Sequence, residues 1–348
     1  MEIGVCTFAD LSPDPKTGKT ISAEKRMGHL LEEMVLADKV GLDIFGLGEH
    51  HRADFVVSDP VIPMAAGAVL TKKIRFTSAV TVLSSADPVR VFQKFAELDL
   101  LSGGRAEIMV GRGSFIESFP LFGYDLEDYD DLFNEKLSLL LAIRDRNEVT
   151  WSGKHRARIN NLGVYPRPLQ NPLPIWIGVG GTPASVIRAG KLGLPLTIAI
   201  IGGQPDQFVS LVQLYREMAH KYAHRNLPVC INSHGFIAEE SAEAARIYFP
   251  YYSAVMNKIG RERGWSPMGW SAFEALRQPE GFLFVGSPEE VAAKILHEYD
   301  LFGHQRFMMQ ISVGALPHDK VLQSIELLGK KVAPLVKAEL KRRALAAK

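Results

Sequence analysis

The sequence predicts a single α/β domain of the (β/α)8, or TIM, barrel class, with insertions after the fourth and seventh strands. Eight short apolar runs alternate with segments of helical periodicity, and several of these helices open with a capping residue followed by proline. A chain of 348 residues suits one such barrel with excursions. No Gly-x-Gly-x-x-Gly turn follows the first strand, which argues against an open dinucleotide-binding sheet.

The first half of the chain supplies four strand and helix pairs. Apolar and β-branched runs predict strands at 3–8, 44–48, 74–83 and 106–111. Helical spacing predicts the intervening helices at 23–40, 60–70, 88–101 and about 126–143. Asp59-Pro60 and Asp87-Pro88 each place a capping side chain before a proline, which marks a helix start.

The second half continues the alternation and contains both excursions. Strands are expected at 174–179, 196–201, 229–238 and 306–313. Helices are expected at 183–192, 204–224, from near 241, at 288–301 after a capping box, and from near 319 into the tail. Segments rich in Gly, Pro and polar residues break the pattern at about 147–173, as a hairpin or irregular excursion, and at about 250–282. We expect one domain over residues 1–348.

Composition narrows the range of partners. The 40 basic and 39 acidic residues give a net charge of +1, so no large field attracts nucleic acid or anionic lipid. Cys6 and Cys230 lie in apolar runs and are expected to be free thiols in a reducing compartment. Glu2 and the lack of a long apolar run near it argue against a signal sequence, so we expect none, and no apolar run is long enough to span a bilayer. We therefore expect a cytoplasmic protein that acts on small molecules.

Glu49, His50 and His51 end the second predicted strand, at the end of a parallel barrel where active sites lie. Neighbouring histidines in an extended chain point to opposite faces, which disfavours chelation, so no metal is predicted. Two interpretations remain, a structural polar cluster and a positioned general base or hydrogen-bond donor.

Two loops have residues suited to an anion. Gly111-Arg112-Gly113 follows the fourth strand, and its arginine can bind phosphate oxygens with both guanidinium nitrogens. The segment 178–183 joins a strand end to Gly180-Gly181-Thr182 and then to a helix start, where free N–H groups favour an anion. Together these loops predict a phosphate site, although a surface-turn arginine is the alternative for Arg112.

The chain is similar over almost its whole length to the bacterial luciferase-like, flavin-dependent monooxygenase family. Four segments carry the resemblance, in matching order and spacing: 46–51 (GLGEHH), 79–90 (AVTVLSSADPVR), 99–113 (DLLSGGRAEIMVGRG) and 174–181 (PIWIGVGG). Within the family, the chain resembles uncharacterised probable monooxygenases.

This resemblance implies FMN at the carboxyl-end mouth of the barrel. It implies that His50 is the active-site histidine and that a cis peptide joins Ala79 and Val80 beneath the flavin. It also implies phosphate contacts from the glycine–arginine loop and the next loop, at Gly111, Arg112, Gly180, Gly181 and Thr182. The implied reaction uses O2 and reduced FMN from a separate NAD(P)H:flavin reductase to oxidise a small organic substrate through a flavin hydroperoxide. The family also suggests a homodimer or higher homo-oligomer.

Two other functions stay open at the level of sequence. Related barrels bind a deazaflavin in the same mouth, which would make the protein a hydride-transfer oxidoreductase, and a non-catalytic flavin-binding protein is also compatible. The substrate depends on loops at 10–20 and 114–125 and on the second excursion. His234, near the seventh strand, is expected to be a core histidine, and Trp265 and Trp270 either line a lid or pack the second excursion.

Overall fold

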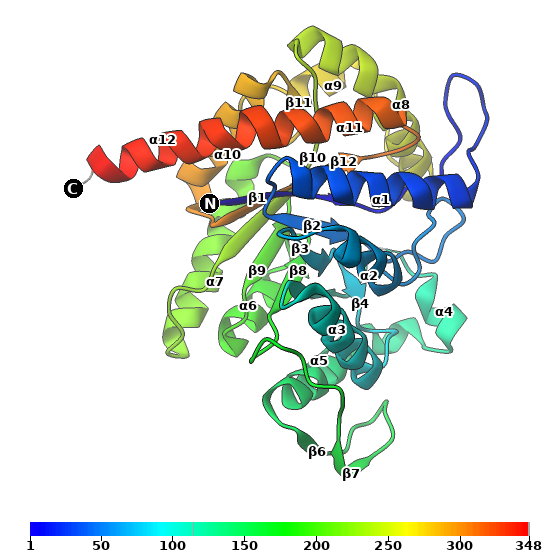
Figure 1. The fold of residues 1–348 in the computed structure, drawn as a ribbon, viewed down its shortest axis with the longest axis vertical. Coiled ribbons are helices and arrows are strands. Elements are labelled where there is room, and N and C mark those ends of the chain that lie inside the picture. Colours follow the sequence, from blue (N-terminus) through cyan, green and yellow to red (C-terminus); the bar gives the residue numbers. More distant parts are fainter. Residues whose placement is uncertain (114, 347–348) are drawn as a thin grey trace.

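Eight parallel strands close into a barrel in the computed structural model, which describes residues 1–113 and 115–346 (Figure 1). Ser114, the first residue of one expected substrate loop, and residues 347–348 of the expected domain lie outside the described residues. The barrel strands are β1 (Glu2–Thr7), β2 (Ile44–Leu47), β3 (Arg75–Ser78), β5 (Ala106–Gly111), β8 (Ile175–Val179), β9 (Leu196–Ala199), β10 (Val229–Ile237) and β12 (Arg306–Ser312). Pairing of β9 with β10 and of β12 with β1 completes the closure, which confirms the predicted fold class.

Helices cover the outside of this barrel and follow the strands in the predicted alternation. They are α1 (Ala23–Lys39), α2 (Val61–Leu70), α3 (Pro88–Ser102), α5 (Tyr129–Asp145), α6 (Pro183–Leu192), α7 (Val209–Lys221), α10 (Pro288–Phe302), α11 (His318–Leu327) and α12 (Ala333–Ala346). The predicted start of α3 is confirmed, because Asp87 accepts hydrogen bonds from the N–H groups of Val89 and Arg90. Among the described residues, no helix is both long and apolar enough to cross a membrane.

The predicted third strand at 74–83 is wrong as one continuous element. It divides into β3 and the short β4 (Thr81–Val82), and the peptide bond between Ala79 and Val80 is cis. Four residue steps from Thr77 to Thr81 face three steps on β5, so the chain bulges at this point. Just beyond the bulge, the Val82 N–H donates to the Glu49 carboxylate at 3.0 Å. The interruption lies at the carboxyl-end mouth of the barrel.

The first excursion contains the antiparallel hairpin of β6 (Glu148–Trp151) and β7 (Ile159–Gly163), as one of the two predicted forms. It extends beyond α5, at the foot of the molecule in Figure 1. The second excursion was placed wrongly, because α8 (Ser241–Arg263) continues through Pro250. Buried tyrosines at 248, 251 and 252 offset the hydrogen bond that proline removes. The second excursion also contains α9 (Trp270–Leu276), and the unpredicted strand β11 (Phe284–Gly286), which pairs with β10, follows it.

Charged side chains fill the amino end of the barrel. The buried Arg306 guanidinium donates to the Glu107 carboxylate at 2.7 and 3.1 Å and to the Glu2 carboxylate at 2.7 Å. It also lies 4.2 Å from the centre of the Trp176 ring. Arg75 forms a second ion pair with Glu107. This network closes one end of the barrel, so a ligand enters from the other.

Candidate active site

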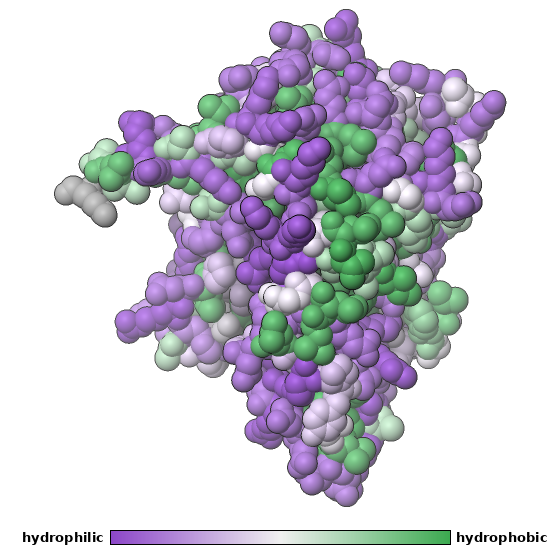
Figure 2. All heavy atoms as spheres, viewed as in Figure 1, coloured by the Kyte–Doolittle hydropathy of each residue, from purple (hydrophilic) through white to green (hydrophobic). Residues whose placement is uncertain are grey.

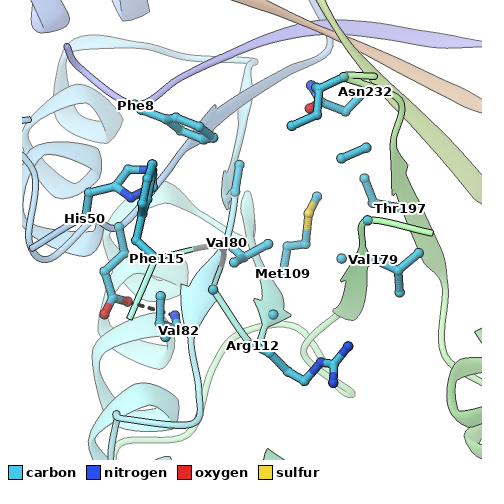
Figure 3. Close-up of a pocket in the computed structure, with 18 of the residues that line it drawn as sticks. Phe8, His50, Val80, Val82, Met109, Arg112, Phe115, Val179, Thr197 and Asn232 are labelled. Carbon is cyan, nitrogen blue, oxygen red and sulfur yellow. Dashed lines mark hydrogen bonds between the residues drawn. The ribbon is translucent and has the colours of Figure 1, made fainter. Parts of the chain in front are cut away.

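A cavity of about 350 Å³ lies at the carboxyl ends of the barrel strands (Figure 3). Residues from all eight barrel strands or the segments that follow them line it, including Val82 of β4. Of the eight residues predicted for the site, seven line the cavity: His50, Ala79, Val80, Gly111, Arg112, Gly180 and Thr182.

 The eighth predicted residue, Gly181, is not part of the cavity lining. At Gly181, a side chain would face Phe208, 3.3 Å away, rather than the cavity.

Val80 forms a flat apolar wall because the strands behind it carry no side chains at that level. A Cβ atom on Gly111 would lie 2.6 Å from Val80 Cγ2, and a Cβ atom on Gly178 would lie 2.7 Å from Val80 Cγ1. Hydrogen bonds hold both ends of this segment. Ser78 Oγ donates to the Met109 carbonyl at 2.8 Å, and the Val82 N–H donates to Glu49. The cis bond implied by the family resemblance is confirmed here, between Ala79 and Val80.

His50 lies in an aromatic cage on the side of the cavity formed by β1 and β2. Its ring centroid is 4.5 Å from Phe8, 4.3 Å from Phe55 and 5.3 Å from Phe115. Burial, with smaller contributions from His51 and Arg52, lowers the pKa of His50 to about 4. The buried Nε2 atom has no hydrogen-bond partner among the described residues. At neutral pH the ring is therefore uncharged and has an unused polar atom.

Glu49 and His51 turn away from His50 and hold the surrounding chain. Glu49 Oε1 lies 3.0 Å from His51 Nε2, while Glu49 Oε2 accepts the Val82 N–H. The His51 ring packs edge-on against Phe122 at 5.1 Å. The two histidines thus have separate surroundings, as alternation along an extended chain requires. These contacts support a structural role for Glu49 and His51 beside His50.

Arg112 lies at the opposite side of the cavity and connects the two predicted anion loops. Its Nη1 donates to Asp130 Oδ1 at 2.6 Å, and its Nη2 lies 3.3 Å from Ser185 Oγ, in the first turn of α6. The guanidinium also stacks over Tyr129, 5.0 Å from the ring centre. Thr182 caps α6 without a side-chain hydrogen bond to the helix. The arginine and the amino end of α6 therefore face the same part of the cavity.

Arg188 adds a second positive charge near Arg112, which the sequence analysis did not assign to the site. Its Nη1 atom is buried without a hydrogen-bond partner among the described residues, and its guanidinium lies 5.2 Å from the Phe133 ring centre. Burial and the nearby charge of Arg112 lower the pKa of Arg188, and Asp130 opposes that effect. Two arginines and a helix amino end thus share one carboxylate, which favours an additional anion.

Several other residues could not be assigned to the cavity from sequence. Phe8, Phe115, Tyr129, Ser185 and Asn232 all line it, but they come from separate elements whose meeting depends on the whole fold. The sequence gives a signal for two of them: Phe8 directly follows β1, and Phe115 lies in the loop at 114–125 after β5 that is expected to shape the substrate site.

The weaker candidates lie outside the cavity lining. His234 is buried against Tyr252, at 5.7 Å between ring centres, as expected for a core histidine. Trp270 packs edge-on against Phe249 at 5.0 Å, and Trp265 lies over Arg263. Both tryptophans therefore pack within the second excursion.

A closed parallel barrel with a polar-ended cavity at the carboxyl ends of its strands is the architecture of a ligand-binding enzyme. The model of the luciferase-like monooxygenase family matches residues 1–305, and the chain belongs to that family. The resemblance predicted from the four motifs is confirmed, and the family makes the protein an oxidoreductase.

Curated relatives cover different shares of the chain. It is 25% identical over 329 residues to the uncharacterized protein y4vJ of Sinorhizobium fredii, which covers 90% of this chain and 92% of that protein. It is 26% identical over 216 residues to the alkanal monooxygenase alpha chain of Photorhabdus luminescens, which covers 61% of this chain and 59% of that protein.

Solved structures share the fold at low sequence identity. Monooxygenase RslO1 from Streptomyces bottropensis aligns with a TM-score of 0.83 at 23% identity, over 96% of this chain and 99% of that one. The oxygenating constituent of 3,6-diketocamphane monooxygenase from Pseudomonas putida, solved with FMN, aligns at 0.78 and 21% identity, over 97% and 98%. The coenzyme F420-dependent tetrahydromethanopterin reductase from Methanopyrus kandleri aligns at 0.72 and 18% identity, over 96% and 99%.

Proposed function

We propose that this protein is an FMN-dependent monooxygenase that uses O2 and reduced FMN, supplied by a separate NAD(P)H:flavin reductase, to oxidise a small organic substrate. One observation carries the proposal. A single cavity joins an anion site at Arg112 and α6 to the neutral His50 across the flat wall at Val80. FMN has a phosphate at one end and a planar ring at the other, so its two parts suit the two sides of this cavity.

The residues present fit FMN on structural grounds. Arg112, the backbone at Gly180 and Thr182, and the Ser185 hydroxyl would hold the phosphate, while Gly111 leaves room for Val80 beside the flavin ring. A side chain added at Gly180 would meet no atom within 4 Å, so the loop there is open to a ligand. Gly181 would contribute through its place in the turn, since it lies outside the cavity lining.

Ala79, Val80 and Met109 would support the flavin ring from one side. Val80 projects over two glycines, and the hydrogen bonds of Ser78 and Val82 fix its position. A rigid apolar wall holds a planar ring in one orientation and excludes water from that side.

Bound reduced FMN would supply the electrons that activate O2 for transfer of one oxygen atom to the substrate. The protein then has to control protons and water beside the ring. His50 is neutral at physiological pH, so its free Nε2 atom can accept or donate one proton according to its tautomer. The rings of Phe8, Phe55 and Phe115 exclude water from this imidazole and offer an apolar surface to the substrate.

A direct test follows bound reduced FMN after it is mixed with oxygenated buffer. Product formation from probe substrates, an alkanal and a cyclic ketone, is measured with ¹⁸O₂ in the same samples. We expect His50→Asn to lower the yield of labelled product and to raise hydrogen peroxide release. His234→Asn is the matched control, because His234 is also buried with a pKa near 4 but lies outside the cavity lining. Equal product yield in both variants would exclude the proposed role of His50.

The phosphate site has its own test, which does not depend on turnover. Dissociation constants of FMN and riboflavin are compared for the wild type and Arg112→Leu. A charge-assisted hydrogen bond contributes about 1.5–3 kcal/mol, so Arg112→Leu should weaken FMN binding by roughly 10- to 100-fold. Riboflavin binding should change little. Equal losses for both ligands would show that Arg112 does not bind the phosphate.

The same titration separates the second candidate function. A deazaflavin-dependent hydride transfer is suggested by the structural likeness to the F420-dependent reductase. Tighter binding of coenzyme F420 than of FMN, with hydride transfer and no oxygen incorporation, would favour that function. FMN binding without turnover on any probe substrate would favour a non-catalytic flavin-binding protein.

We further propose that the protein forms a homodimer or higher homo-oligomer through α2 and α3. Figure 2 shows apolar side chains gathered over these two helices. The most exposed apolar residues on these two helices are Ile62, Val69, Leu70, Leu100 and Leu101, which are 48–72% exposed. A surface patch of this kind marks a protein contact, and closed symmetry lets the same patch on two copies meet. Light scattering should detect the oligomer, and Ile62→Lys with Val69→Lys should produce monomers of unchanged secondary structure.

A further inference from the structure

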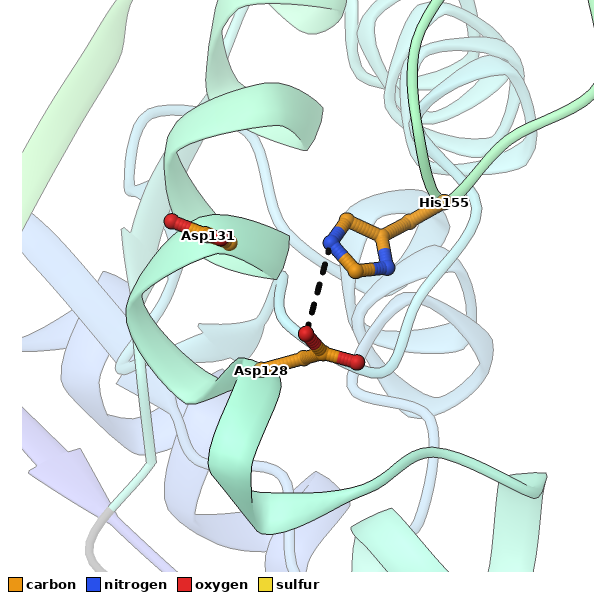
Figure 4. Close-up of side chains that lie close together, drawn as sticks. All are labelled: Asp128, Asp131 and His155. Atoms are coloured by element: carbon orange, nitrogen blue, oxygen red, sulfur yellow. Dashed lines mark ion pairs between the residues drawn. The ribbon is translucent and has the colours of Figure 1, made fainter.

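A second group of possible ligands lies outside the cavity, where the loop between β6 and β7 meets the start of α5. Asp128, Asp131 and His155 each offer one ligand atom, and these atoms all lie within 4.8 Å of one another. Figure 4 shows Asp128 just before α5, Asp131 in the first turn of that helix and the imidazole of His155 approaching from the loop. The Asp128 carboxylate does not cap α5, because this residue precedes the helix without a side-chain hydrogen bond to it.

The imidazole of His155 is the independent sign of a ligand. Its side chain is only 10% exposed, and its Nε2 atom is buried without a hydrogen-bond partner among the described residues. The nearest carboxylate oxygen, Oδ1 of Asp128, is 3.9 Å away, which is too far for a hydrogen bond. Buried polar atoms are normally paired, so an unpaired nitrogen aimed at two carboxylates calls for a further partner.

The loop that carries His155 is fixed in place independently of its imidazole. Glu135, one turn further along α5, accepts hydrogen bonds from the N–H of Lys154 at 2.6 Å and from the N–H of His155 at 3.1 Å. Its carboxylate thus holds the backbone of the loop against the helix. Because those bonds involve only main-chain atoms of 154 and 155, replacing the His155 side chain leaves them intact.

Lys154 shares the carboxylates without filling the site. Its ammonium lies 3.0 Å from Asp128 Oδ1 and 3.8 Å from Asp131 Oδ2, and its side chain is 67% exposed. A hydrogen bond and the charge of Asp128 raise the pKa of Lys154. Exposed ion pairs contribute little to stability, so this flexible side chain can leave when a dication binds.

We propose that Asp128, Asp131 and His155 form a site for a first-row divalent metal ion, with Zn²⁺ as the best-suited ion. One imidazole and two carboxylates are ligands that Zn²⁺ accepts at about 2.0–2.2 Å, with water completing four-coordination. Such bonds place neighbouring ligand atoms roughly 3.4 Å apart in a tetrahedron. The ligand atoms must therefore move inward slightly, which the 69% exposed Asp131 side chain can do. The bound ion fastens the β6–β7 hairpin to α5.

The test measures Zn²⁺ binding to the full chain by competition with a chromophoric chelator, together with thermal unfolding. We expect one ion per chain and a higher melting temperature with Zn²⁺. Asp131→Asn and His155→Ala should each weaken binding about tenfold or more and remove the thermal shift. Lys154→Gln should tighten binding, by up to about fivefold, because it removes a competing charge.

His318→Ala is the matched control, since His318 also lies beside two carboxylates, 2.7 Å from Glu32 and 3.7 Å from Glu33. It should leave the high-affinity Zn²⁺ site unchanged. The proposal is overturned if Zn²⁺ binds no more tightly than Mg²⁺, or if His155→Ala binds Zn²⁺ as the wild type does. Loss of binding in His318→Ala alone would place the ion elsewhere and overturn it as well. Asp131→Asn changes an exposed side chain, so a folding defect does not confuse the result.

Discussion

Adding one methyl group behind Val80 tests the reasoning about the flat wall. In Gly178→Ala, the new Cβ would lie 2.7 Å from Val80 Cγ1. In Gly180→Ala, two residues further on and just past the end of β8, the new Cβ would meet no atom of the described residues within 4 Å. Neither glycine has a positive φ, so alanine fits both backbones. The pair of variants therefore differs in the space around the methyl group.

The expected size of the effect follows from the stiffness of Val80. A β-branched side chain has few rotamers, and its Cγ atoms lie one bond from Cβ. The backbone of Gly111 lies against its other Cγ atom, and hydrogen bonds hold both ends of the segment, so Val80 must move toward the cavity to relieve the clash. Overpacking of this kind costs about 1–3 kcal/mol. Gly180→Ala should be neutral or stabilise by up to about 1 kcal/mol, because alanine restricts the unfolded chain.

Urea unfolding of the flavin-free protein, followed by circular dichroism, measures both free energies. The double variant Gly178→Ala with Val80→Ala should recover part of the loss, with a coupling energy of about 0.5–3 kcal/mol, because the smaller side chain removes the clash. The reasoning is refuted if the two glycine variants are equally stable within about 0.5 kcal/mol. It is refuted equally if the effects of Gly178→Ala and Val80→Ala simply add.

Three further predictions concern stability. The pKa of His50 falls from 6.5 to about 4 on folding, so the unfolded state binds more protons between these pH values and the stability of the protein should decrease as the pH drops through them. Unfolding at several pH values should show this loss to be smaller in His50→Asn, by up to about 3 kcal/mol. The same pH dependence in both proteins would contradict this prediction. Glu49→Ala leaves the Val82 N–H without its acceptor and should lower the free energy of unfolding in urea by about 1–3 kcal/mol. Glu49→Gln keeps an acceptor oxygen and should lower it less, and equal losses in the two variants would count against that hydrogen bond. Arg306→Met leaves the buried Glu107 carboxylate with Arg75 alone and should cost about 3 kcal/mol, a loss that Glu107→Gln in the same chain should reduce.

Most of the barrel could be predicted because its signals are local. The start of α3 depends on Asp87 and the proline that follows it, and both act within one helical turn. The third strand could not be predicted as it is, because its interruption depends on distant groups. Ser78 bonds to Met109 and Val82 bonds to Glu49, and neither partner is a sequence neighbour. A continuous β-branched run therefore looked like one strand.

Helix α8 differs from its prediction in the opposite sense, because an interruption is expected near Pro250 and the helix is continuous. The sequence predicts that the helix ends near Pro250, since proline removes one backbone hydrogen bond and strains an isolated helix. In the fold, Tyr248 and Tyr252 are buried and stack on each other at 5.2 Å between ring centres. Tertiary packing thus outweighs a local penalty, and this balance cannot be calculated from the segment alone.

The residues of the candidate site also fall into two groups, those with a local sequence signal and those whose positions depend on the whole fold. Arg112 and the glycines of 178–181 could be identified because glycine and arginine in a loop after a strand restrict what the loop can do. The partners of Arg112 could not, since Asp130 and Ser185 come from two helices and Arg188 from a further turn of the second. Their meeting is a property of the closed barrel.

The distribution of charge along the barrel makes one side of the cavity more favourable for an anionic group than the other. At the amino end, Arg306 and Arg75 are matched by Glu107 and Glu2, so this network contributes little field to the cavity above it. Within the cavity His50 is neutral. Among the described residues, the carboxylate that pairs with Arg112 is that of the exposed Asp130, which also acts on Arg188 in α6. A ligand with one anionic end and one uncharged planar end therefore gains electrostatic energy in one orientation. We expect that orientation, with the anion at Arg112, to place the planar end against Val80 and within reach of His50.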